Sequence, residues 1–205
     1  MRGQRKDKIE PHLHAVKEQE ALHEKTVLGF WIYLLSDLIL FGTLFATYFV
    51  LFNPEVMKSL QGKGFQESFL MQTITFVTLS AISGLSLSFL YQNKKQVAGV
   101  SLASILCLGF IFLKLQMQQF QQLTYQGYRW DSNGCLSAFY TVIGTHTLHV
   151  ILGLLWTALL LLSFKTKLNL RVHIRRANCL KLFWQFLNIV WVLIWSLIIL
   201  KGAAL

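Results

Sequence analysis

The sequence predicts an all-α integral membrane bundle of five transmembrane helices. Of its 205 residues, 54% are hydrophobic and only 14% are charged, whereas about 25% are charged in an average soluble domain. Five apolar runs each approach or exceed the roughly 20 residues that cross a bilayer as a helix. Lysine and arginine together outnumber aspartate and glutamate by 19 to 9. In a membrane protein this excess first indicates topology, and it gives no reason to expect nucleic-acid binding.

Residues 1–25 are expected to form a polar cytoplasmic tail, and residues 26–205 the five-helix membrane domain. The tail has six basic and five acidic residues, and Pro11 interrupts it, so we expect at most one short surface helix there. It lacks the short apolar core and the small-residue cleavage site of a signal peptide. Its three histidines have neither cysteine partners nor regular helical spacing, which does not favour a metal site.

The expected spans are about 26–52, 69–91, 97–120, 136–164 and 179–200. The first has a single charge, Asp37, and ends at Asn53-Pro54. The second and third have small residues at intervals of four, which lets another helix approach closely. The fourth has no charged residue at all. Between them we expect polar connections at 55–68, 92–96, 124–135 and, strongly basic, 165–178.

The distribution of basic residues predicts the orientation of the chain. The tail, the 92–96 turn and the 165–178 loop hold thirteen basic residues, whereas the other loops and the C-terminus hold four. Because basic loops stay on the cytoplasmic side, the N-terminus is expected in the cytoplasm and the C-terminus in the periplasm.

A few polar side chains lie within the spans and are the candidate site residues. His146 and His149 are three residues apart and therefore share a helix face. Asp37 lies about 16 Å into the first span, at a depth that overlaps theirs. Gln185 and Asn188 form a second one-face pair in the fifth span. An ionised group at mid-bilayer costs about 2.5 to 3.5 kcal/mol, so we expect all five to face protein.

Three roles remain open for these groups: hydrogen bonds between helices, a proton path or lipid-headgroup contact, and metal or haem ligation. Haem with two axial histidines needs imidazoles from opposite sides, whereas both span histidines are on one face. The spans show no nucleophile–base pair, phosphate loop or paired carboxylates, so we expect no catalytic, cofactor-binding or metal-binding residue. Without a CxxC pair, the three cysteines are interpreted as small apolar residues: Cys107, Cys135 and Cys179.

Three stretches resemble subunit III of the haem–copper respiratory oxidases, in the five-helix form of bacterial bo-type ubiquinol oxidases. They are GFWIYLLSDLILFGTLFATY (29–48), GCLSAFYTVIGTHTLHVILGLLW (134–156) and CLKLFWQFLNIVWVLIW (179–195). Asp37 falls where the family has a buried carboxylate, and His146 and His149 match its HGxH motif. The usual WHFxDxxW reads WQFLNIVW here, with Gln185 for histidine and Asn188 for aspartate. Gln116 and Gln119 stand where glutamates are frequent. Amides do not titrate near neutral pH, which favours a structural role for these sites.

The resemblance implies a respiratory-chain subunit of the bacterial inner membrane with no active site of its own. It implies direct packing beside subunit I, which holds the haems and copper, contact with the other oxidase subunits, and bound phospholipid. The implied role is to support assembly, turnover stability and proton uptake while the complex oxidises ubiquinol, reduces oxygen and pumps protons. A short-form cytochrome c oxidase remains an alternative. An independent transporter is a more distant one, and it would require a continuous polar stripe through one helix.

Overall fold

The computed structural model describes residues 3–60, 63–164 and 170–203, and every regular element in those ranges is a helix. Their bounds are α1 Gly3–Val50, α2 Pro54–Leu60, α3 Lys63–Tyr91, α4 Lys95–Tyr125, α5 Gly134–Ser163 and α6 Leu170–Ala203. Five of these helices contain a segment long and apolar enough to span a membrane, in α1, α3, α4, α5 and α6. The expected all-α, five-span architecture is therefore confirmed.

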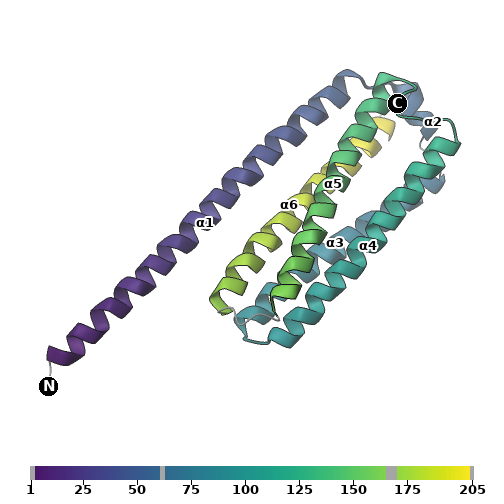
Figure 1. Ribbon diagram of the computed structural model, residues 1–205. Coiled ribbons are helices and arrows are strands. Elements are labelled where there is room, and N and C mark those ends of the chain that lie inside the picture. Colours follow the sequence, from purple (N-terminus) through teal and green to yellow (C-terminus); the bar gives the residue numbers. More distant parts are fainter. Residues whose placement is uncertain (1–2, 61–62, 165–169, 204–205) are drawn as a thin grey trace. The chain divides into compact units, whose positions relative to one another are not determined.

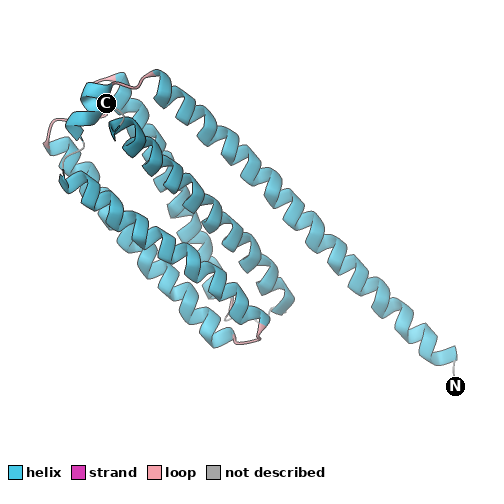
Figure 2. Ribbon diagram, turned by 180° about the vertical axis from the view of Figure 1, so that it is seen from behind, coloured by secondary structure: helices cyan, strands magenta, loops and turns pink. Residues whose placement is uncertain are grey.

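The chain divides into two compact units, residues 1–38 and 39–205. In the second unit, α3 packs against α4 and α6, while α5 packs against the same two helices. The four helices thus close a ring in which neighbours along the chain run antiparallel (Figures 1 and 2). The short helix α2 packs against α6. In the first unit, the described residues belong to one continuous helical stretch of α1.

Specific caps end the helices at the turns. Asn93 adopts φ 59° after α3, and Gly127 adopts φ 88° after α4. In both cases the backbone N–H of the next residue donates to the carbonyl five residues earlier. Lys94 donates to Phe89 and Tyr128 to Leu123, each at 3.0 Å. These left-handed residues and their bonds form Schellman motifs, which satisfy carbonyls at a helix C-terminus.

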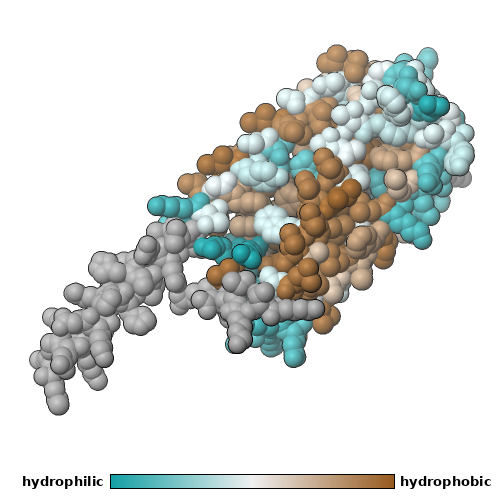
Figure 3. Space-filling model, in the orientation of Figure 1, coloured by the Kyte–Doolittle hydropathy of each residue, from teal (hydrophilic) through white to brown (hydrophobic). Residues whose placement is uncertain are grey.

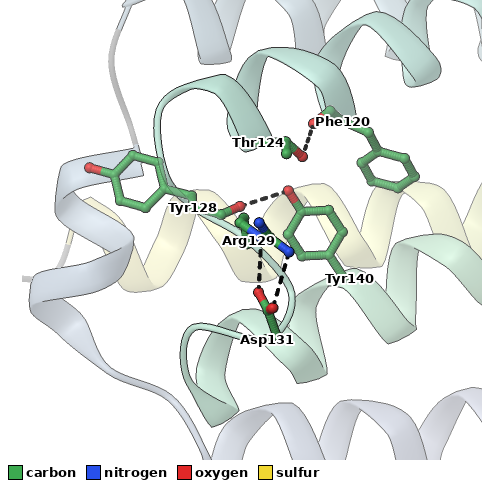
Figure 4. A network of polar contacts seen from close by, with 6 residues as sticks. All are labelled: Phe120, Thr124, Tyr128, Arg129, Asp131 and Tyr140. Carbon is green, nitrogen blue, oxygen red and sulfur yellow. Dashed lines mark hydrogen bonds and ion pairs between the residues drawn. The ribbon is translucent and has the colours of Figure 1, made fainter.

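The connection between α4 and α5 is held by its own polar contacts (Figure 4). The Tyr140 hydroxyl donates to the Tyr128 carbonyl at 2.9 Å. The Arg129 guanidinium meets Asp131 through two contacts of 3.2 Å. At the start of α5, the Asn133 side chain accepts from the Leu136 amide at 2.8 Å, as an N-cap residue does. These bonds fix where α5 enters the bundle.

Some helix boundaries differ from those expected. Residues 3–25, expected as a tail with at most one short helix, continue directly into the first span, and α1 runs through Pro11. The expected loop at 165–178 is helical from Leu170 onward. The reason is that charged and polar residues such as Arg, Lys, Glu and Gln favour helix, so a polar stretch marks the membrane surface and not the end of a helix. The expected loop at 55–68 likewise contains α2 and the start of α3.

Candidate functional site: a buried aromatic and polar cluster

The centre of the second unit is a cluster that takes side chains from all four helices. It consists of Phe76 on α3, Phe112 on α4, His146 on α5, and Trp184 and Trp191 on α6, all with 0% exposure. The Phe76 and Phe112 rings are 4.8 Å apart between centroids, and Trp191 meets Phe112 edge-on at 5.1 Å. Tilted and edge-on contacts of this kind are the favoured packing of aromatic rings. We call these five residues the core cluster.

His146 is the polar member of the core cluster. Its ring centroid lies 5.3 Å from Phe76 and 5.1 Å from Trp191. Its Nε2 lies 3.2 Å from the Leu187 carbonyl, and since a carbonyl only accepts, Nε2 carries the proton. This bond attaches α5 to the backbone of α6, one residue before Asn188.

The two tryptophans of the core cluster extend the polar contacts to α3 and α5. The Trp191 indole N–H donates to Thr73 Oγ1 at 3.1 Å, and the Trp184 indole N–H donates to Thr157 Oγ1 at 3.3 Å. Trp184 and Trp191 are seven residues apart, which places them on one face of α6. Each indole therefore has a hydrogen-bond acceptor in the interior, as buried tryptophan usually requires.

Close backbone approach brings α5 against its neighbours. A Cβ on Gly153 would lie 2.9 Å from Phe183 Cε1 and 3.1 Å from the Trp184 ring. A Cβ on Gly109 would collide with the side chain of Leu154. Both glycines are therefore needed for the observed spacing, in the way that small residues permit close helix packing in membranes.

The other predicted site residues are not members of the core cluster. His149 donates from Nδ1 to the Thr145 carbonyl of its own helix at 2.8 Å, and its ring lies 5.3 Å from Phe41. Asn188 is half-buried, whereas Gln185 is exposed. Asp37 belongs to the first unit and interacts there with the hydroxyl of Tyr33. A contact between Asp37 and the histidines therefore remains a prediction.

Sequence reasoning did not name most of the core cluster as a site. His146 is its one member among the predicted site residues. Phe76, Phe112 and the acceptor Thr73 were not singled out, because apolar and hydroxyl residues are common on every face of a spanning helix. The spacing of seven between Trp184 and Trp191 was the available signal.

Metal ligation is another of the roles that the sequence leaves open for the polar groups in the spans. Within residues 24–59, 66–164 and 172–196, no three His, Cys, Asp or Glu side chains gather in a way that holds a metal ion. One nitrogen of each span histidine is instead engaged with a backbone carbonyl. The His146 bond joins α5 to α6, whereas the His149 bond lies within α5.

Comparison with known proteins agrees with this structural picture. A family model described as "Cytochrome c oxidase subunit III" matches residues 6–203. Subunit 3 of cytochrome bo(3) ubiquinol oxidase is 36% identical in Pseudomonas putida, over 87% of each chain. The same subunit from Pseudomonas aeruginosa is 34% identical, over 87% of this chain and 86% of the relative. Cytochrome c oxidase subunit 3 of Bacillus sp. strain PS3 is 32% identical over 85% of each chain. The chain therefore belongs to the cytochrome c oxidase subunit III family.

Proposed function

We propose that this chain supports the assembly and turnover stability of a proton-pumping quinol oxidase, in which it is the non-catalytic subunit III. The observation that carries the proposal is the 36% identity, over 87% of both chains, to a ubiquinol oxidase subunit 3. The family match over residues 6–203 and the five apolar helices agree with it. In such complexes the haems and copper lie in subunit I, and subunit III carries no redox centre.

The core cluster suggests how the chain performs a supporting role. Aromatic packing and the bonds from His146, Trp184 and Trp191 join α3, α5 and α6, while Phe112 adds α4. Lipid provides no hydrophobic force to hold helices together, so packing and interhelical hydrogen bonds must do so. A unit held in this way offers other subunits a surface of fixed shape.

The outer surface of the second unit suits lipid and a neighbouring subunit. Large apolar side chains are exposed along its helices, and Figure 3 shows them on the visible flank. Among them are Phe110 and Ile111 on α4, Leu155 and Leu159 on α5, and Ile189 on α6. We propose that one such face packs against subunit I of the oxidase and that phospholipid covers others. Apolar surface of this extent is stable only against lipid or protein.

The orientation follows from charge. With the N-terminus in the cytoplasm, thirteen basic residues lie on the cytoplasmic side and four on the periplasmic side of a bacterial inner membrane. A reporter that is active only in the periplasm, fused after Leu205, is expected to be active. A fusion active only in the cytoplasm would contradict this orientation.

Asp37, His146, His149, Gln185 and Asn188 are proposed as a buried polar seam, or as support for lipid binding and proton uptake. The bond from His146 to α6 supports the first role. The half-buried position of Asn188, directly after the bonded Leu187, agrees with it. The exposed position of Gln185 fits contact with lipid or another subunit better than contact within this chain.

A short-form cytochrome c oxidase is the second candidate for the host complex. The relative from Bacillus sp. strain PS3, named cytochrome c oxidase subunit 3, favours it at 32% identity. The two Pseudomonas relatives named as ubiquinol oxidase subunits are more similar, at 36% and 34%. Copper in the partner subunit II distinguishes the two complexes, because a cytochrome c oxidase carries it there and a quinol oxidase does not.

Purification of the tagged chain in mild detergent tests the proposal. We expect haem-bearing subunits to co-purify, and the preparation to oxidise ubiquinol and consume oxygen. Reduced cytochrome c in place of ubiquinol serves as the control substrate and identifies the alternative complex. A stable chain that purifies alone, without haem, would refute membership of either oxidase complex.

A further inference from the structure

A second polar group lies one helical turn from the core cluster, between α3 and α4. It consists of Gln72 on α3 and of Gln116 and Gln119 on α4, with exposures of 0%, 1% and 3%. Gln72 Nε2 donates to Gln119 Oε1 at 3.0 Å. We call these three residues the amide cluster.

Helix geometry places the third amide beside the bonded pair. Gln116 lies four residues after Phe112 and three before Gln119, so all three share one face of α4. On α3, Gln72 and Phe76 are likewise one turn apart. Since Phe112 meets Phe76 and Gln119 meets Gln72, Gln116 faces α3 between these two contacts.

Four polar atoms of the amide cluster are buried and have no partner among the described residues. They are Gln72 Oε1, both Gln116 Oε1 and Nε2, and Gln119 Nε2. Two of them are carbonyl oxygens that accept, and two are amide nitrogens that donate. A polar group left without a partner in an apolar interior is strongly unfavourable. Something with both donors and acceptors is therefore required at this place.

We propose that the amide cluster binds buried water between α3 and α4. One water molecule donates twice and accepts twice, which matches the two open oxygens and two open nitrogens. Buried waters in proteins typically make two to four such bonds to otherwise unsatisfied groups. Gln72 and Gln119 have already used one donor and one acceptor on each other, so the water completes their bonding and does not replace it.

The position of the amide cluster along the helices favours a supply of water. Gln119 lies six residues before Tyr125, the end of α4, and Gln72 lies six after Gln66, where the apolar segment of α3 begins. At 1.5 Å per residue, both are about 9 Å from these ends. Gln118, Gln121 and Gln122 are exposed in the same part of α4, so this end of the helix is polar outside as well as inside.

The test is a cryo-electron microscopy map of the intact oxidase, at a resolution that shows ordered water elsewhere in the complex. We expect a solvent peak within about 3 Å of the Gln116 amide, the length of an ordinary hydrogen bond. Gln116→Met keeps the length of the side chain without its amide, and it is expected to lose the peak. Gln118→Met, an exposed position on the same helix, is the matched control and should retain it.

The wild-type map alone can overturn the proposal, so it does not depend on assembly of the variant. Absence of a peak near Gln116, or three amides bonded directly to one another, refutes the water site. A peak that persists in Gln116→Met refutes the role of that amide. Neither outcome affects membership of the oxidase complex, which the co-purification experiment tests separately.

Discussion

The indole N–H of Trp191 lies 3.1 Å from Thr73 Oγ1, and this hydrogen bond joins α6 to α3 across 118 residues of sequence. Thr73 donates its own hydroxyl proton to the Phe69 carbonyl at 2.8 Å, which leaves its oxygen to accept from Trp191. The ring of Phe69 stacks on Trp191 at 5.5 Å with an interplanar angle of 12°. One turn of α3 thus binds both the face and the polar edge of the indole.

Thr73→Val is expected to destabilise the second unit because it removes the acceptor and leaves the Trp191 N–H unpaired. Leaving a buried donor unpaired costs about 1 to 3 kcal/mol. The measurement is the thermal denaturation midpoint of the purified complex, monitored as the loss of this subunit from the complex. The change in side-chain volume is small, so packing contributes little to the difference.

Thr78→Val provides the matched control for this substitution. Thr78 is an exposed residue on the same helix, and its hydroxyl donates to the Ile74 carbonyl one turn earlier. It should leave the denaturation midpoint nearly unchanged. Equal midpoints for the two variants would show that the bond from Trp191 contributes nothing to stability.

Gly153→Ala tests the close contact between α5 and α6. The added methyl group would lie 2.9 Å from Phe183 Cε1 and 3.1 Å from the Trp184 ring, so these side chains or their helix must shift. Overpacking of this kind costs about 1 to 3 kcal/mol. We expect a lower denaturation midpoint and weaker retention of the subunit on the complex.

The control for Gly153 is Gly144, which lies on the same helix and is half-buried. A Cβ at Gly144 meets nothing within 4 Å among the described residues. Gly144→Ala should therefore be neutral or raise stability by up to about 1 kcal/mol, since alanine favours helix over glycine. A larger loss of stability for Gly144→Ala than for Gly153→Ala would disprove the role assigned to close packing at Gly153.

The sequence was sufficient to predict the five spans because each is an apolar run of spanning length, and lipid requires helical backbone there. It did not predict where the helices α1 and α6 begin. The 165–178 stretch has five basic residues but neither proline nor glycine, so its charge marks the membrane surface without stopping the helix. Nor did the sequence indicate that Thr73 meets Trp191, because helical periodicity gives the face of each helix but not which turns of two helices align.

His146→Phe tests the bond that attaches α5 to the backbone of α6. Phenylalanine has a ring that can replace the packing against Phe76 and Trp191, but it cannot donate to the Leu187 carbonyl. The substitution is expected to lower the free energy of unfolding by about 1 kcal/mol, the usual net value of one hydrogen bond. Thr147→Val is the control, because Thr147 bonds to Ile143 of its own helix. A midpoint for His146→Phe equal to that of the control would contradict an interhelical role for this histidine.

Substitutions of Asp37 test whether its carboxyl acts by hydrogen bonding or by exchanging a proton. Asp37→Ala is expected to reduce assembly of the oxidase or its survival during turnover, with little change in the initial rate, because the redox centres lie in subunit I. Asp37→Asn keeps the size and a hydrogen-bonding amide but does not ionise. It should behave like wild type if the seam acts by hydrogen bonding, and like Asp37→Ala if the carboxyl must exchange a proton.

The measurements for both Asp37 variants are the amount of assembled haem complex and the decay of oxygen consumption over repeated turnover. Ser36→Ala serves as the control, since Ser36 is exposed and donates to the Ile32 carbonyl of its own helix. Normal assembly and survival of Asp37→Ala would eliminate both roles for this carboxyl.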